Sequence, residues 1–93
     1  MGQITQSGNR WEVSGDVEID HASALLLASN ALTIADGATV DFTNVKEIDT
    51  AAISLILEWK RRAIAEKKQL KFVNFPANLT SLTQLYGVAD LIN

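Results

Sequence analysis

Apolar and polar residues alternate near the start of the chain. Trp11 and Val13 are separated by one polar residue and flanked by others, which is the two-residue period of a strand with one buried face. Gly8-Asn9 interrupts this pattern with the residue types of a tight hairpin turn. The pattern therefore predicts two short strands joined by that turn, at residues 3–7 and 10–14.

After the hairpin, apolar residues recur at spacings of three and four instead of two. Residues 21–35 are rich in alanine and leucine and end before Asp36-Gly37, which predicts a helix with Asp20 as its N-cap. Spacings of three and four predict an inward stripe of mostly small side chains on this helix: Ala24, Leu25, Ala28, Ala31, Leu32 and Ala35.

In the second half of the chain, segments with the two-residue period of a strand alternate with segments that have the period of a helix. We expect strands at residues 38–42 and 70–75, with a helix at about residues 50–67 between them. A third helix follows Pro76 and ends at Gly87, with one face formed by Leu79, Leu82, Leu85 and Tyr86. The order β-β-α-β-α-β-α predicts a single α/β domain over residues 1–93, a mixed four-stranded sheet packed with three helices.

The middle helix has an unusually wide apolar surface. One stripe should face the sheet: Ile53, Ile56, Leu57 and Ile64. A neighbouring stripe widens the apolar arc to roughly 200°, beyond the roughly 100° of a core-facing helix, and it consists of Ala52, Leu55, Trp59 and Ala63. Two explanations stay open. Another helix of the same chain covers the second stripe, or a partner protein does.

An extended segment passes into this helix at residues 42–53. Asp49 suits the N-cap, because a carboxylate accepts hydrogen bonds from the free amides of the first turn. Thr50 follows it, and the small side chains of Ala51 and Ala52 leave the hydroxyl uncrowded. Threonine is routine at such a position. A free hydroxyl there can also bond to another protein or carry a phosphate.

Composition and charge exclude several classes of function. The chain has 93 residues, a net charge of −3 and no cysteine, so disulfides, thiolate metal sites and thiol nucleophiles are excluded. The acidic balance makes nucleic acids and anionic bilayers poor partners. The one basic concentration, Lys60-Arg61-Arg62 with Lys67-Lys68, is expected to be the solvated end of the middle helix. No apolar run reaches the roughly 20 residues of a membrane span, so we expect a cytoplasmic protein.

Residues suited to catalysis are few. His21 is the only histidine and has no second ligand beside it, and the carboxylates of Asp16, Glu18 and Asp20 lack the spacing of a calcium loop. The glycines form neither of the phosphate-binding patterns. No serine or threonine can be matched to a base and an orienting acid. We therefore expect no enzyme activity, no metal site and no cofactor.

Three stretches resemble the STAS domain family, which is shared by anti-sigma factor antagonists and the cytoplasmic tails of sulfate transporters. One is similar to the family's central strand, loop and helix start, one to the segment before its first helix, and one to its closing turn. They are Val40-Asp41-Phe42-Thr43 leading to Ile48-Asp49-Thr50-Ala51-Ala52-Ile53, then Ser14-Gly15-Asp16-Val17-Glu18-Ile19-Asp20, and Leu85-Tyr86-Gly87-Val88. The resemblance spans nearly the whole chain and implies the STAS fold.

Within that family, Asp49-Thr50 and the compact length look more like the small STAS subunits of Mla-type ABC transporters, which move phospholipid between the two membranes of Gram-negative cells. The resemblance implies a non-catalytic regulatory subunit whose Asp-Thr helix start docks on the ATPase subunit and supports its assembly and activity. It would meet the membrane only through the transporter. We expect the partner-binding residues to be Asp49, Thr50, Ala51, Ala52, Leu55 and Trp59.

The alternative is an anti-sigma factor antagonist that binds a kinase and is switched by phosphorylation of Thr50. Such antagonists usually carry serine at or beside the position of Thr50 and glycine at that of Ala52, whereas this chain has threonine followed by two alanines.

Overall fold

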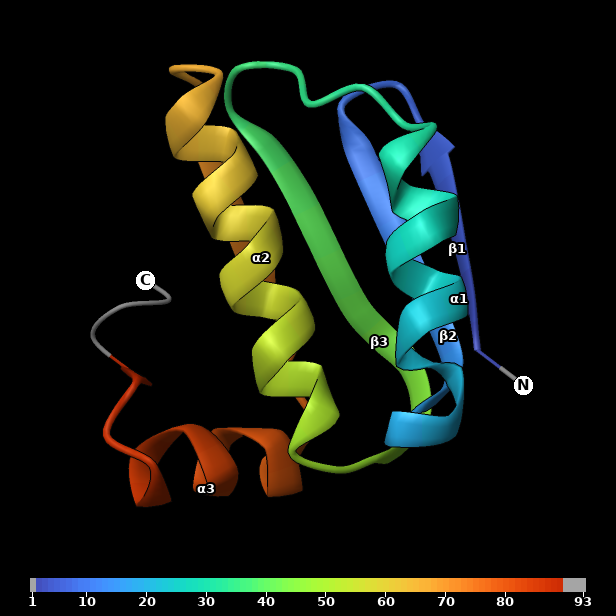
Figure 1. The fold of residues 1–93 in the computed structure, drawn as a ribbon, viewed down its shortest axis with the longest axis vertical. Helices are drawn as coiled ribbons and strands as arrows, with labels where there is room; N and C mark the ends of the chain where they lie inside the picture. The colour runs from blue at the N-terminus through green and yellow to red at the C-terminus, as the bar shows by residue number, and fades with distance from the viewer. Residues whose placement is uncertain (1, 90–93) are drawn as a thin grey trace.

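Residues 2–89 form seven elements in the order that the sequence predicts. They are described by a computed structural model, shown in Figure 1. The strands are β1 (Gln3–Ser7), β2 (Arg10–Val17), β3 (Ala38–Ile48) and β4 (Leu70–Val73), and the helices are α1 (Ile19–Asn30), α2 (Ala51–Ala65) and α3 (Ala77–Leu85). The predicted α/β class, with a mixed four-stranded sheet and three helices, is confirmed.

The four strands lie side by side in the order β1-β2-β3-β4. β1 and β2 are antiparallel, and Gly8 in the turn between them has a φ of 60°, a left-handed conformation that glycine adopts without strain. β2, β3 and β4 are parallel, so α1 and α2 are the crossover connections. Both helices lie on one face of the sheet, and α3 lies at the lower end of α2 (Figure 1).

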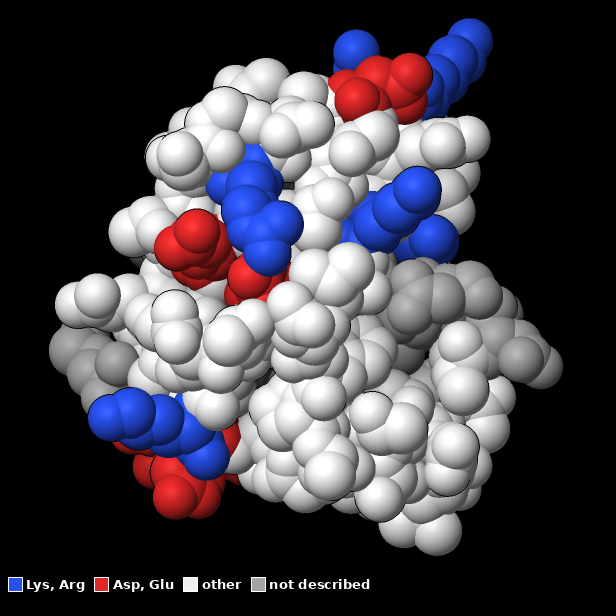
Figure 2. Space-filling model, turned by 180° about the vertical axis from the view of Figure 1, so that it is seen from behind, with Lys and Arg blue, Asp and Glu red and all other residues white. Residues whose placement is uncertain are grey.

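The opposite face of the sheet is polar. Arg10, Glu12, Asp41 and Lys71 point to this side, alternating along their strands with buried residues such as Trp11. Figure 2 views the molecule from behind, and it shows basic and acidic side chains close together there. The sheet therefore has one buried face and one solvated face.

Strand boundaries differ from the predicted ones. β2 continues to Val17 and β3 to Ile48, because the two strands stay paired although their register shifts twice. Such irregularities break the alternation by which a strand is recognised in a sequence. β4 is shorter than predicted and ends at Val73, since Asn74 turns away from the extended conformation with a φ of 60°.

α1 presents a different face to the core from the one predicted. Leu25 and Ser29, one turn apart, are its buried residues, and the helix ends at Asn30 rather than at residue 35. Alanine is tolerated on both faces of a helix, so its spacing did not reveal the buried one. The predicted stripe of small residues is wrong for three exposed members: Ala24, Ala28 and Ala31.

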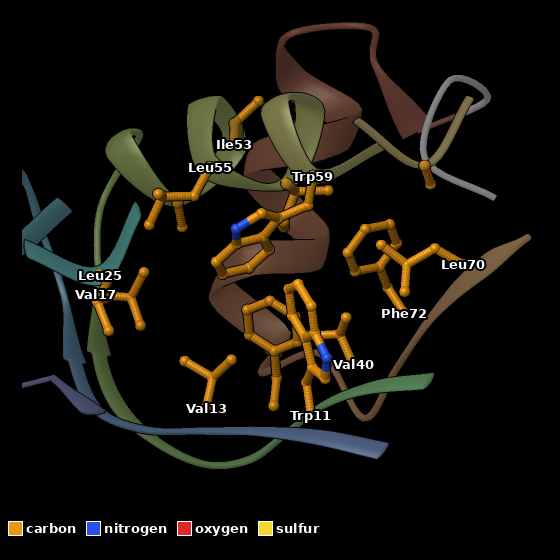
Figure 3. Close-up of a cluster of buried hydrophobic side chains, with 14 of the residues drawn as sticks. Trp11, Val13, Val17, Leu25, Val40, Ile53, Leu55, Trp59, Leu70 and Phe72 are labelled. Atoms are coloured by element: carbon orange, nitrogen blue, oxygen red, sulfur yellow. The ribbon is translucent and has the colours of Figure 1, made fainter. Parts of the chain in front are cut away.

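Two tryptophans occupy the centre of the core, between the helices and the sheet (Figure 3). The rings of Trp11 and Trp59 meet edge to face, with their centroids 6.0 Å apart. Each indole N–H has a partner on the segment that contains α1. Trp59 donates to the hydroxyl of Ser29 at 2.8 Å, and Trp11 donates to the carbonyl of Thr33 at 3.1 Å.

The second apolar stripe of α2 is covered by the chain itself. Trp59 is 1% exposed and Leu55 3% exposed, and Ala52 and Ala63 are equally enclosed. Of the two explanations for the wide apolar arc, packing against α1 is therefore the correct one. The predicted sheet-facing stripe needs one correction, because Ile64 is 67% exposed.

Arg62 joins α2 to the end of α1. Its guanidinium donates to the carbonyls of Ser29 and Leu32 at 2.9 and 2.5 Å and lies 5.7 Å from the ring centroid of Trp11. The basic cluster is therefore not wholly solvated as expected, since this cation complements the negative end of the α1 dipole.

α3 ends as predicted but faces the core differently. Gly87 has a φ of 68° and donates to Gln84, while Val88 donates to Thr83, which is the Schellman pattern. Leu79 is buried. The residues of the predicted apolar face are divided between core and surface, because Leu85 and Tyr86 are exposed.

Candidate functional site

Asp49 connects the starts of α1 and α2. One carboxylate oxygen accepts from the amide of Ala51 at 2.8 Å, and the other accepts from the amide of Ile19 at 3.0 Å. The predicted hydrogen bond from the first turn of α2 to this carboxylate is therefore present, but the N-cap residue of α2 is Thr50 and Asp49 precedes it. Asp20, predicted as the cap of the first helix, instead lies within the first turn of α1, and the side chain that accepts from this end of the helix is Asp49 from the neighbouring element.

Thr50 is the exposed residue of this junction. It flanks the first turn of α2 in a helical conformation, and its side chain makes no capping hydrogen bond. Because Asp49 already accepts the free amide of Ala51, the hydroxyl of Thr50 remains available to an incoming group. The small Ala51 follows it and is half-buried.

Two grooves meet at Thr50. The first has a volume of about 330 Å³ and lies between α1 and α2, lined by Ile19, Ala22, Ser23, Leu26, Thr50, Ala51, Ser54, Leu55 and Glu58. The second has a volume of about 550 Å³ and lies between the start of α2 and α3, lined by Ile48, Asp49, Thr50, Asn78, Ser81, Leu82 and Leu85. Thr50 lines both grooves, so a protein bound over it could fill one or both.

Of the six residues expected to bind a partner, some lie at the surface and others are buried in the core. Asp49, Thr50 and Ala51 lie together at the mouth of α2, and Leu55 lines the first groove although it is nearly buried. Ala52, Leu55 and Trp59 are all enclosed by the core, which contradicts the alternative in which a partner covers their stripe. Trp59 packs against Trp11 and bonds to Ser29, so its apolar surface serves the interior.

Sequence reasoning missed apolar residues that edge these grooves. Ile19 is 74% exposed in the first and Leu85 is 76% exposed in the second, next to the exposed Tyr86. One signal was present in the sequence, because no charged residue occurs between Lys71 and Asp90. A surface helix without charge is unusual for a solvated face. Figure 2 shows the region around α3 as a broad area of uncharged atoms.

Asp41 forms a second polar centre, on the solvated face of the sheet. Its carboxylate accepts from the amide and hydroxyl of Thr43 at 2.9 and 2.6 Å, from the side-chain amide of Asn74 at 3.0 Å, and from Arg10. Partial burial acts to raise the pKa of Asp41. The hydrogen bonds outweigh it and hold that pKa well below the usual range of a carboxyl group. This network ties β2, β3 and the end of β4 together.

Comparison with known families gives the assignment. A family model described as "Mlab, STAS domain" matches residues 3–93. The chain belongs to the MlaB-type STAS domain family. No curated protein sequence matches it significantly. The family resemblance expected from the sequence is thus confirmed over nearly the whole of this STAS domain.

The described part of the STAS domain contains neither a metal-binding cluster nor a membrane-spanning helix. Among residues 2–89, no group of three or more histidine, cysteine, aspartate or glutamate side chains is placed to hold a metal ion. None of the helices in that range is both long and apolar enough to cross a bilayer. What the junction provides is a hydroxyl, a helix start and two apolar grooves, which together suit the docking of another polypeptide.

Proposed function

We propose that this STAS domain is a non-catalytic regulatory and assembly subunit of a phospholipid-transporting ABC complex, and that it binds the ATPase subunit through the Asp49-Thr50 helix start. The match to the MlaB-type family over residues 3–93 is the observation that carries the proposal. In this role the domain works in the cytoplasm and meets the inner membrane only through its partners. It contributes to lipid asymmetry of the outer membrane by supporting the ATPase.

The geometry around Thr50 supports this docking face. A partner side chain or loop that reaches the hydroxyl can place apolar groups in the two grooves beside it, which adds buried area to a single polar contact. Ile19 and Leu85 would lose their exposure in such a contact. The proposed docking face therefore consists of Thr50 and the two grooves that it lines. It does not extend along the apolar stripe of α2 to Trp59.

Co-purification tests the proposed partner directly. The tagged chain would be isolated from its own host, together with the products of the genes that neighbour its own. We expect an ABC-type ATPase in stoichiometric amount. Recovery of a sigma-regulating kinase with no ATPase would contradict the proposal.

A second candidate, an anti-sigma factor antagonist, is favoured by one observation. The hydroxyl of Thr50 is exposed, makes no capping bond and lies at a helix start, where a phosphate would be stabilised by the helix dipole. A kinase could therefore modify it and so release the bound partner. Mass spectrometry of the protein isolated from cells separates the two candidates, since the antagonist requires a phosphorylated fraction of Thr50 and the transporter subunit does not.

A further inference from the structure

A third groove lies far from Thr50, between the outer side of α2 and the free edge of β4. It has a volume of about 550 Å³. Leu70, Phe72 and Ala63 form its apolar floor, and Lys60, Lys68 and Lys71 surround it. Among the residues that the structure describes, no acidic residue lines this groove, whereas Glu58 lines one of the two grooves beside Thr50 and Asp49 lines the other.

The three lysines are free of acidic partners within residues 2–89. Each arginine of the chain pairs with a carboxylate: Arg10 with Asp41, Arg61 with Glu58, and Arg62 with Glu66. None of the three lysines takes part in such a pair among the described residues. The molecule is acidic overall, so this groove gathers positive charge that no carboxylate within residues 2–89 pairs with.

β4 is an edge strand with its backbone available. It pairs with β3 on one side, and no described strand lies on the other. The carbonyl of Gln69 accepts from Gly37 at 3.0 Å, which directs this residue's backbone groups toward β3. Neighbouring residues in a strand direct these groups to alternate sides, so the N–H and C=O of Leu70 and Phe72 point outward along the groove.

We propose that this groove binds an acidic, extended segment of a partner protein, which adds to the sheet as a further strand beside β4. The outward backbone groups of Leu70 and Phe72 would provide the hydrogen-bond ladder. Apolar side chains of the segment would cover the floor next to Ile64, and its carboxylates would pair with the lysines.

Charge selects this occupant over the alternatives. A second copy of the chain would bring Lys60, Lys68 and Lys71 against their own counterparts, and edge lysines of this kind disfavour self-pairing. An anionic bilayer would neutralise the lysines but would leave the strand edge without hydrogen-bond partners. The acidic extended segment satisfies both the charges and the backbone groups.

The proposal goes beyond the docking face at Thr50. In Figure 1 the start of α2, which follows Thr50, and its far end, which precedes Lys68, lie at opposite ends of the molecule. A fifteen-residue helix is about 22 Å long, so both surfaces can be occupied at once. Either proposal can therefore fail without the other.

Selection from a random peptide library tests this groove without a known partner. The immobilised full chain would be panned against displayed peptides of about eight residues, the length of an ordinary strand. We expect the enriched sequences to alternate acidic and apolar residues. On binding, hydrogen exchange should slow at the amides of Leu70 and Phe72. Affinity should fall about tenfold in Lys68→Glu and in Lys71→Glu.

Lys46→Glu is the matched control, because it makes the same charge change on an exposed lysine outside the groove. It should leave peptide binding unchanged. Enriched peptides without an acidic bias, protection that maps to the grooves beside Thr50, or no enrichment at all would each overturn the proposal. Binding to phosphatidylglycerol vesicles that is lost in Lys68→Glu, without peptide binding, would assign the lysines to a membrane surface instead.

Discussion

Asp49 and Thr50 divide two tasks that a single residue often performs at a helix start. Asp49 accepts the free amides of two helices, while Thr50 keeps its hydroxyl free at the surface. The sequence suggested both roles, because aspartate and threonine are common at this position. It did not reveal that the second amide bound by Asp49 belongs to Ile19, since that contact joins elements distant in the chain.

Ser29 supports the core through the indole of Trp59. Replacing it in Ser29→Ala would leave a buried N–H without an acceptor, which costs about 1–3 kcal/mol. We expect thermal denaturation to show a Tm lower by several degrees. Affinity for the proposed ATPase partner should stay unchanged, because Ser29 and Trp59 are both buried. A loss of affinity without a loss of stability would indicate that Trp59 contacts the partner, in contradiction to its buried position.

Asp41 makes stability depend on pH. Its pKa is lower in the folded protein than in the unfolded chain, so its contribution is fully present above the unfolded value of about 4 and is lost as pH falls through the folded value. We therefore expect the free energy of unfolding to decrease as the pH falls below about 4. Asp41→Asn should be less stable than the unmodified chain at neutral pH. Its free energy of unfolding should also fall less steeply as the pH is lowered. Urea denaturation at a series of pH values measures both.

At the scale of elements, the order and type of every helix and strand followed from hydrophobic periodicity, but the boundaries and buried faces did not. β2 and β3 remain paired through an irregular register that no local pattern encodes. α1 has alanines on both faces, so its orientation depends on Ser29 meeting Trp59 and on Arg62 reaching its last carbonyls. These contacts join α1 to α2 and appear only once the sheet has brought the two helices together.

Asp49 should couple the first turns of these two helices. Asp49→Ala removes the acceptor of both the Ile19 and the Ala51 amides, which costs about 1–2 kcal/mol per lost cap at most. Hydrogen exchange followed by NMR should then accelerate at both amides together. Acceleration at Ala51 alone would show that the bond to Ile19 contributes nothing.

At the scale of the whole molecule, the surface is divided by charge. Basic and acidic side chains occupy the solvated face of the sheet and the far end of α2, whereas α3 carries no charged residue (Figure 2). The grooves beside Thr50 are lined by one carboxylate each, Glu58 in the first and Asp49 in the second. The sequence located the centre of the candidate site at Asp49-Thr50 but not its extent. Ile19 and Leu85 reach it from α1 and α3, and periodicity placed Leu85 only on an apolar face of its helix.

Leu85 should contribute to partner binding through the second groove. Leu85→Arg places a charge on an already exposed side chain, so stability should hardly change while affinity for the ATPase subunit falls about tenfold. Leu27→Arg is the matched control, because Leu27 is 73% exposed on α1 and lines neither groove. Equal effects of the two variants would show that the second groove is not part of the contact.

The affinity of the ATPase subunit for Thr50→Glu tests the docking face most directly. Glutamate at the start of α2 suits the helix dipole, so the variant should fold with an unchanged Tm. It should also bind at least about 30-fold more weakly, which corresponds to about 2 kcal/mol for an unpaired charge in the contact. Ser7→Glu, which adds the same charge opposite Arg10, should bind like the unmodified chain. Equal affinities for Thr50→Glu and the unmodified chain in a calorimetric titration would contradict docking at Thr50.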